Sequence, residues 1–253
     1  MIINTIDPVL FSLGPLQIRY YGVIYALGFI LAYLFLTYAI RKGRITLTNK
    51  DLDDLFLHLI IGVVVGARLF HFIFYQPQTI LNDPLEMLFI WHGGLSFHGG
   101  LVGAGLALYF FSRKKKISWI SLADALGVPA ALALALGRIA NFTNHELYGQ
   151  VTNVPWCVVF ATAEGCRHPY QIYAALSHLL LFAVLLYVYF RQRRNGLTLW
   201  TFVFLYGALR FLTDFFRDDP RLLGISMGQF LSLVMALVGG YVLVKRRWRK
   251  GAG

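Results

Sequence analysis

The chain contains seven long apolar stretches, and each is long enough to cross a lipid bilayer as a helix. A bilayer core about 30 Å thick requires about 20 apolar residues in helical form. Backbone groups in hydrocarbon must be hydrogen-bonded within their own segment, so each stretch is expected to be helical. The expected spans are 17–40, 52–75, 88–112, 119–141, 170–191, 197–216 and 225–244.

The composition supports the same fold class. Of the 253 residues, 58% are hydrophobic and only 14% are charged, and the mean hydropathy is +0.62. A soluble domain carries about 25% charged residues, so a water-soluble enzyme is excluded. We expect an all-α membrane protein with about seven transmembrane helices, forming a single polytopic transmembrane domain over residues 1–253. The first sixteen residues lack a basic region and a small-residue cleavage site, so no removable signal peptide is expected.

The distribution of charge predicts the orientation. Basic residues concentrate after the first, third, fifth and seventh spans, in the ranges 41–50, 113–116, 191–194 and 245–250. By the positive-inside rule the N-terminus lies outside and the C-terminus in the cytoplasm, and residues 142–169 form a small extracytoplasmic connection. The net charge of +11 then reflects topology and contact with anionic lipid headgroups. A nucleic-acid partner is not expected, because no exposed aromatic surface accompanies the basic residues.

Four arginines fall inside the expected spans: Arg19, Arg68, Arg138 and Arg210. An arginine at mid-bilayer costs about 2.5–3.5 kcal/mol and is usually functional. In the predicted orientation all four lie toward the outer surface. Arg19 is explained as an anchor whose side chain reaches the headgroups, whereas Arg68 fits an anchor or a functional role equally well.

Arg138 and Arg210 have polar neighbours on their own helix faces. Asn141 follows Arg138 by three residues, and Tyr206, Arg210 and Asp214 recur at a spacing of four. One interpretation of Arg210 and Asp214 is a buried ion pair that locks two helices together. The alternative is an anion site, because guanidinium groups bind phosphate oxygens in a bidentate manner and lipid phosphate is abundant at this depth.

A glycine-rich stretch, WHGGLSFHGGLVGAG, occupies residues 91–105. Glycines permit close helix packing, which we expect for Gly103 and Gly105. His98 is flanked by Gly99 and Gly100, and it suits either an interhelical hydrogen bond or a proton acceptor near neutral pH. No spacing of histidines and carboxylates indicates a metal site.

Three further residues lie in the 142–169 connection. Cys157 and Cys166 are compatible with a disulfide in an oxidising compartment or with a catalytic thiol, and no other motif supports the thiol. His145 stands beside Glu146 and fits a local charge partner better than a metal ligand.

Several motifs together resemble one known family, the prolipoprotein diacylglyceryl transferases. Its two signatures are similar to GLSFHGG at 94–100 and GRIANFTNHELYG at 137–149. Four more stretches match in family order: DPVLFSLGPLQIRYYGVIYALGF at 7–29, HPYQIY at 168–173, YGALRFLTDFFR at 206–217 and ISMGQ at 225–229.

The resemblance implies a reaction at the outer leaflet of the bacterial cytoplasmic (inner) membrane. The diacylglyceryl group of phosphatidylglycerol would pass to the lipobox cysteine of an exported preprolipoprotein, giving a thioether and glycerol 1-phosphate. No metal or soluble cofactor is expected. Arg138 and Arg210 would stabilise the departing phosphate, and either His98 or a lipid phosphate would take the thiol proton. The residues expected to bind or orient the lipid are Arg138, Asn141, Glu146, Gly149, Tyr21, Tyr206, Asp214, Gly99 and Gly100.

The sequence departs from the family pattern at four positions. His145 replaces a usual glycine, Asp214 a glutamate, Tyr170 a serine and Ala174 a glutamate. The shorter Asp214 puts its reach to Arg210 in question, and the changes are compatible with a different donor lipid. Two other functions remain open: a transporter for an anionic solute, and a membrane protein that binds phospholipid without catalysis.

Overall fold

A computed structural model describes residues 2–14, 16–89, 94–191, 195–222 and 224–248. For residues 13, 16, 97, 98 and 246–248 it describes the backbone only. Contacts divide the chain into two compact units, and each is described by itself. The first unit contains Met1–Phe35 and Ala123–Gly253, and the second is Leu36–Leu122.

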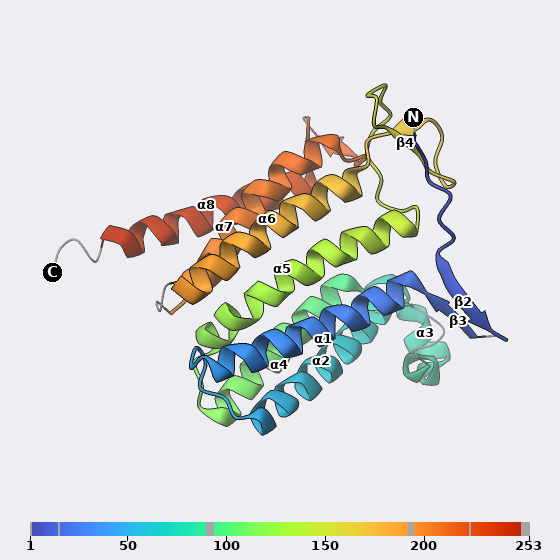
Figure 1. Cartoon of the computed structure of the whole chain (residues 1–253). Helices are drawn as coiled ribbons and strands as arrows, with labels where there is room; N and C mark the ends of the chain where they lie inside the picture. The colour runs from blue at the N-terminus through green and yellow to red at the C-terminus, as the bar shows by residue number, and fades with distance from the viewer. Residues whose placement is uncertain (1, 15, 90–93, 192–194, 223, 249–253) are drawn as a thin grey trace. The chain divides into compact units, whose positions relative to one another are not determined.

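Helices dominate the described chain (Figure 1), as the apolar stretches predict. The α-helices are α1 (Tyr20–Arg41), α2 (Asn49–Tyr75), α3 (Pro77–Asn82), α4 (Phe97–Lys115), α5 (Trp119–Thr143), α6 (Tyr170–Arg191), α7 (Leu197–Thr213) and α8 (Met227–Trp248). Within the described residues, 6 helices are long and apolar enough to cross a membrane, and they correspond to α1, α2, α5, α6, α7 and α8.

The third expected span, 88–112, is corrected at its start. A 3-10 helix, η1 (Pro84–Leu88), occupies the residues before it, and α4 begins only at Phe97. Part of the predicted start, residues 90–93, lies outside the described residues. Gly94 adopts a left-handed φ of 71°, which favours a turn over a helix at that position. The apolar part of α4 is shorter than expected because the helix begins late, whereas its last turn is basic, in agreement with the expected end at residue 112.

Short strands also occur, and the sequence did not predict them. They are β1 (Ile2–Ile3), β2 (Val9–Leu13), β3 (Leu16–Arg19), β4 (Val158–Val159), β5 (Cys166–Arg167), β6 (Arg221–Leu222) and β7 (Ile225–Ser226). β1 pairs parallel with β4, and β4 pairs antiparallel with β5. The pairs β2–β3 and β6–β7 are antiparallel. Most of them span only two residues, which is too short for an alternating pattern to reveal.

In the second unit, α2 and α4 pack through glycines. A Cβ atom added at Gly66 would collide with the carbonyl oxygen of Gly99, and one added at Gly103 would collide with that of Gly62. Small residues thus let the two backbones approach closely, as in other membrane helix pairs. The packing prediction is confirmed for Gly103. For Gly105 it is wrong, because no atom of the described residues lies within 4 Å of an added Cβ.

In the first unit, α7 packs against both α6 and α8 (Figure 1). A Cβ at Gly207 of α7 would lie 2.5 Å from the carbonyl oxygen of Ser232 in α8. Asp124 of α5 connects to the start of α7, because its carboxylate accepts hydrogen bonds from the backbone N–H of Gly196 (2.5 Å) and Leu199 (2.7 Å). A carboxylate at a helix N-terminus stabilises the otherwise unpaired N–H groups there. These contacts help to fix the orientation of α7 and therefore of its polar stripe, which consists of Tyr206, Arg210 and Asp214.

Candidate active site

The last turns of α5 carry a hydrogen-bonded chain of polar side chains. Arg138 Nη1 lies 3.5 Å from Asn141 Oδ1, which confirms the shared face predicted from their spacing. Asn141 Nδ2 donates to Glu146 Oε1 at 2.7 Å. Because the carboxylate can only accept, it fixes the amide with its oxygen toward Arg138. Asn141 thus joins the end of α5 to the 142–169 connection. The hydroxyl of Tyr21 lies 3.2 Å from that of Tyr25, and its predicted part in the site stays a prediction.

The polar stripe on α7 is formed as its spacing predicts. Arg210 Nη1 donates to the hydroxyl of Tyr206 at 2.8 Å, and Nε lies 3.4 Å from Asp214 Oδ2. Asp214 is only 1% exposed, and it reaches Arg210 despite being shorter than glutamate. The ion pair joins positions i and i+4, and Asp214 also accepts a hydrogen bond from Tyr170 of α6. The pair therefore takes part in a contact between helices, and its role as an anion site stays a prediction. Helix geometry places such a pair on one face, where both members can serve a single site.

Tyr170 connects the two arginine groups, although the sequence indicated it only as a departure. It begins α6, is 1% exposed, and donates its hydroxyl to Asp214 Oδ1 at 2.5 Å. The guanidinium carbon of Arg138 lies 5.8 Å from the centre of its ring. Within the first unit, Tyr170 therefore contacts Arg138 through its ring and Arg210 through Asp214.

Two other residues near this cluster were missed as well. Arg217, the last residue of the YGALRFLTDFFR stretch, was given no role from the sequence, yet its guanidinium carbon lies 5.6 Å from the ring centre of Tyr170. His178 of α6 is buried and stacks on Tyr206 with 5.6 Å between ring centres. The spacing of His178 and Arg217 in the sequence gave no signal, because these contacts join residues from different helices.

Gly149 marks a crossing of three backbone segments. Its N–H donates to His168 O at 3.0 Å, and the next N–H, from Gln150, donates to Phe216 O at 2.9 Å. A Cβ atom at position 149 would lie 2.6 Å from both His168 Cβ and Phe216 O. The close approach that requires glycine here is therefore an approach of protein segments. Its predicted contact with lipid stays a prediction.

His145, which the sequence left without a clear role, fastens the 142–169 connection to the N-terminal segment. Its Nδ1 accepts from the N–H of Ala161 at 3.4 Å, so Nε2 carries the proton and donates to Ile6 O at 2.8 Å. The residue is 6% exposed and has a left-handed φ of 54°. It acts as a structural connection beside Glu146, and Glu146 forms no ion pair with it among the described contacts.

A cavity of about 450 Å³ opens beside these residues. Glu146, Arg217 and Asp218 line it together with Asn144, His145, Leu147, Tyr148, Thr162 and Asp219. Glu146 therefore joins the Arg138–Asn141 chain to a space large enough for part of a ligand. Arg217 pairs with Asp219 at 3.2 Å, so the cavity wall contains both charges.

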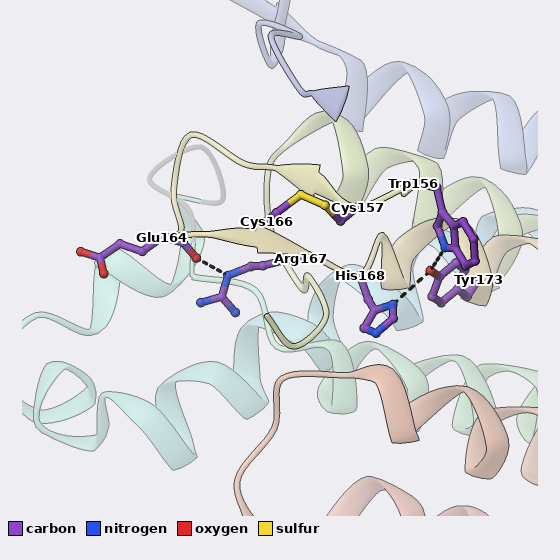
Figure 2. The surroundings of a disulfide bond; sticks show 7 residues. All are labelled: Trp156, Cys157, Glu164, Cys166, Arg167, His168 and Tyr173. Carbon is purple, nitrogen blue, oxygen red and sulfur yellow. Dashed lines mark hydrogen bonds between the residues drawn. A yellow bond between two sulfur atoms is a disulfide. The ribbon is translucent and has the colours of Figure 1, made fainter. Parts of the chain in front are cut away.

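Cys157 and Cys166 form a disulfide across the β4–β5 hairpin (Figure 2), which answers the question that the sequence left open. The next residue, Arg167, donates to Gly149 O at 3.2 Å and pairs with Asp218 at 2.7 Å. His168 Nδ1 lies 3.2 Å from the hydroxyl of Tyr173, and partial burial lowers the pKa of His168. The disulfide thus stabilises β5, and Arg167 in this strand binds the backbone at Gly149.

His98, Gly99 and Gly100 belong to the second unit. Their backbone forms the first turn of α4, where the Ser96 hydroxyl accepts from Gly99 N at 3.4 Å. The side chain of His98 lies outside the described residues, so its role as a base stays a prediction. Gly99 faces α2, because an added Cβ would collide with Gly66 and Phe70.

Arg68 secures the segment that leads into α4. Its guanidinium donates to four carbonyl oxygens, from Glu86 at 2.6 Å, Phe89 at 2.8 Å, Met87 at 3.1 Å and Gly94 at 3.2 Å. It is 5% exposed and lies 3.7 Å from the Glu86 carboxylate. A buried charge surrounded in this way is satisfied by its own protein. Of the two roles that the sequence left open, the lipid anchor is therefore excluded for Arg68.

The apolar helices define a multi-pass membrane protein. Its first unit holds Arg138 and Arg210 at the Tyr170–Asp214 pair, and Glu146 connects Arg138 and Asn141 to a polar cavity. A family model described as prolipoprotein diacylglyceryl transferase matches residues 8–245. The chain belongs to this family, as the resemblance of its motifs predicts.

Curated relatives cover nearly the whole chain. A protein of Geobacter sulfurreducens is 45% identical over 251 residues, covering 96% of each chain. One of Bordetella avium is 44% identical over 246 residues, covering 94% of this chain and 93% of the relative. One of Nitrosomonas europaea is 44% identical over 242 residues, covering 92% and 87%. All three are named phosphatidylglycerol–prolipoprotein diacylglyceryl transferase.

Proposed function

We propose that this protein transfers the diacylglyceryl group of phosphatidylglycerol to the lipobox cysteine of exported preprolipoproteins. The observation that carries the proposal is the pairing of Arg138 and Arg210 around Tyr170 and Asp214. Two guanidinium groups held near one place suit a phosphate that gains charge as it departs. Family membership and the names of the relatives support the same substrates.

The reaction needs one bond to form and one to break. The cysteine sulfur bonds to the terminal glyceryl carbon of the diacylglyceryl group, and the bond from that carbon to the phosphate oxygen breaks. Glycerol 1-phosphate leaves with the electron pair, and the two arginines stabilise its charge. The thiol proton passes to His98 in this proposal, because the thiolate is the attacking form.

The neighbouring polar groups orient the lipid. Glu146 holds Asn141, and the hydroxyl of Tyr25 lies 3.2 Å from that of Tyr21, so both side chains can present fixed donors and acceptors to the headgroup. Tyr206 holds Nη1 of Arg210. In this proposal Gly99, Gly100 and Gly149 serve substrate binding indirectly. They let the protein segments around the substrate pack closely, since an added Cβ would collide with protein atoms at Gly99 and would lie 2.6 Å from them at Gly149.

We further propose that the chain forms a single polytopic domain over residues 1–253 in the bacterial cytoplasmic membrane. In this proposal α4 also crosses the membrane, which brings the number of spans to seven. Its last turn contains Arg113, Lys114 and Lys115. The positive-inside rule then puts the N-terminus and the 142–169 connection outside and the active site toward the outer leaflet. Exported substrates would reach the site from that face. A reporter that is active only in the cytoplasm, fused within 142–169, is expected to be silent.

The activity is tested with purified protein in phosphatidylglycerol vesicles and a synthetic lipobox peptide. Mass spectrometry should show the peptide gaining one diacylglyceryl group. Arg138→Ala should abolish this gain, whereas Arg19→Ala should retain it, because Arg19 is exposed and its side chain bonds only to Gln17 within the described residues. An unmodified peptide, where a relative of established activity modifies it, would refute the function. Binding of the lipid without transfer would support the non-catalytic alternative.

A further inference from the structure

Tyr170 binds Asp214, which pairs with Arg210, and its ring lies beside Arg138. The family resemblance implies no role for it. We propose that Tyr170 is a positioning residue that sets the geometry of Arg138 and Arg210 toward the phosphate of the donor lipid. It would do so through its hydroxyl bond to Asp214 and through its ring. This inference rests on the proposed function.

The hydroxyl of Tyr170 determines how Asp214 holds Arg210. The two carboxylate oxygens have separate partners: Oδ1 accepts from Tyr170 at 2.5 Å, and Oδ2 lies 3.4 Å from Arg210 Nε. Asp214 is 1% exposed, so each oxygen depends on a protein partner in place of water. Without the hydroxyl, one oxygen would lose its donor and the carboxylate would turn to share the arginine. The direction of the guanidinium would then change.

Arg210 is held at two of its three nitrogens. Nε faces Asp214, and Nη1 donates to Tyr206 at 2.8 Å. Within the described part of the chain, Nη2 has no hydrogen-bond partner and can donate to a ligand. A small rotation of the guanidinium therefore moves the donor that is left for the phosphate.

The ring of Tyr170 lies beside two other guanidinium groups. The distances from its centre are 5.8 Å to the Cζ of Arg138 and 5.6 Å to the Cζ of Arg217. A cation within about 6 Å of an aromatic face is attracted to it. The ring and the Asp214 charge together offset the repulsion among three arginines, which would otherwise spread apart.

Tyr170 acts through its neighbours. It is 1% exposed, and Asp214 engages its hydroxyl, so the phenol has no surface for substrate. Its loss should therefore lower the rate of the chemical step and leave binding of the peptide unchanged.

The test compares Tyr170→Phe, Asp214→Asn and the double variant with the full-length wild type in phosphatidylglycerol vesicles. Tyr170→Phe keeps the ring and removes the hydroxyl. Misplacement of a catalytic group by about 1 Å can cost about 100-fold in rate, and we expect kcat to fall at least ~10-fold with KM for the peptide unchanged. Because both single changes disrupt one interaction, the double variant should be no slower than Asp214→Asn.

Tyr173→Phe is the matched control. Tyr173 lies on the same helix, and its hydroxyl binds Trp156 and His168 (Figure 2) and no arginine. This variant should keep the wild-type kcat. As a second measurement, the inhibition constant of glycerol 1-phosphate should rise in Tyr170→Phe and stay constant in Tyr173→Phe, because the product binds through the same arginines.

The outcomes separate the two proposals. If the wild type leaves the peptide unmodified, the proposed function fails. If the wild type is active and Tyr170→Phe equals it in kcat and product inhibition, the positioning role is overturned. Equal losses in Tyr170→Phe and Tyr173→Phe, or fully additive losses in the double variant, would also overturn it.

Discussion

Opening the Cys157–Cys166 disulfide should loosen the 142–169 connection while α6 stays folded. The bond closes a loop with a sequence separation of 9. Chain-entropy arguments give such a cross-link about 2.6 kcal/mol of stabilisation. A change of that size corresponds to roughly a 70-fold change in the opening equilibrium of the segment it braces, since about 1.4 kcal/mol is tenfold.

Amide hydrogen exchange measures this opening directly. The reporting amides are Thr152, which donates to Cys166 O at 2.8 Å, and Asn4, which donates to Val159 O at 3.0 Å. In a Cys157→Ser, Cys166→Ser variant both should exchange roughly 70-fold faster than in the oxidised wild type. Peptides from the middle of α6 provide the internal control, because the disulfide does not touch them.

Reduction provides a second control. Dithiothreitol should bring wild-type exchange to the level of the double serine variant and leave that variant unchanged. Exchange of Thr152 and Asn4 that stays within about threefold of the oxidised wild type would refute the reasoning, because it would leave less than about 1 kcal/mol for the cross-link.

Three other substitutions, the first with a matched control, test the packing within the two units. Gly149→Ala should lower the melting temperature in detergent and the transfer activity, because the new Cβ would lie 2.6 Å from two neighbouring atoms; Gly105→Ala, in open space, should change neither. Asp124→Ala should destabilise the start of α7 by about 1 kcal/mol, measured as faster amide exchange at Gly196 and Leu199, its two donors. Arg68→Lys should cost at least about 1.5 kcal/mol, because an ammonium group cannot satisfy all four carbonyls. Limited proteolysis near residues 84–89 would detect this loss of stability. Unchanged resistance to proteolysis would contradict the role of Arg68 in holding the four carbonyls.

Local spacing predicted the contacts within single helices. Arg138 with Asn141, and Arg210 with Tyr206 and Asp214, lie where three- and four-residue spacing puts them. A helix fixes these distances by its own hydrogen bonds, whatever packs against it. The same spacing left open whether Asp214 also binds a neighbouring helix, which it does through Tyr170 of α6.

Contacts between distant residues were invisible to spacing. Tyr170 meets Asp214 across 44 positions, and His145 meets Ile6 across 139. Such pairs depend on which helices pack together and on how the connections between them close. The start of α4 was misjudged for a related reason, since Arg68 binds four carbonyl oxygens of residues that precede α4, and spacing does not reveal such contacts.

The amino-acid sequence by itself determined the helical membrane class, most of the spans and the family, and it identified Arg138 and Arg210 as candidate site residues. Hydrocarbon leaves the backbone few alternatives to a helix, and charge is too costly there to occur without a reason. Only the tertiary structure decided that Tyr170 lies beside Arg138 and binds the Asp214 that pairs with Arg210. It also decided that Gly149 is a crossing of backbones and that His145 fastens the N-terminal segment. These features arise because packing brings buried polar groups from distant segments together, and each must then find its partner there.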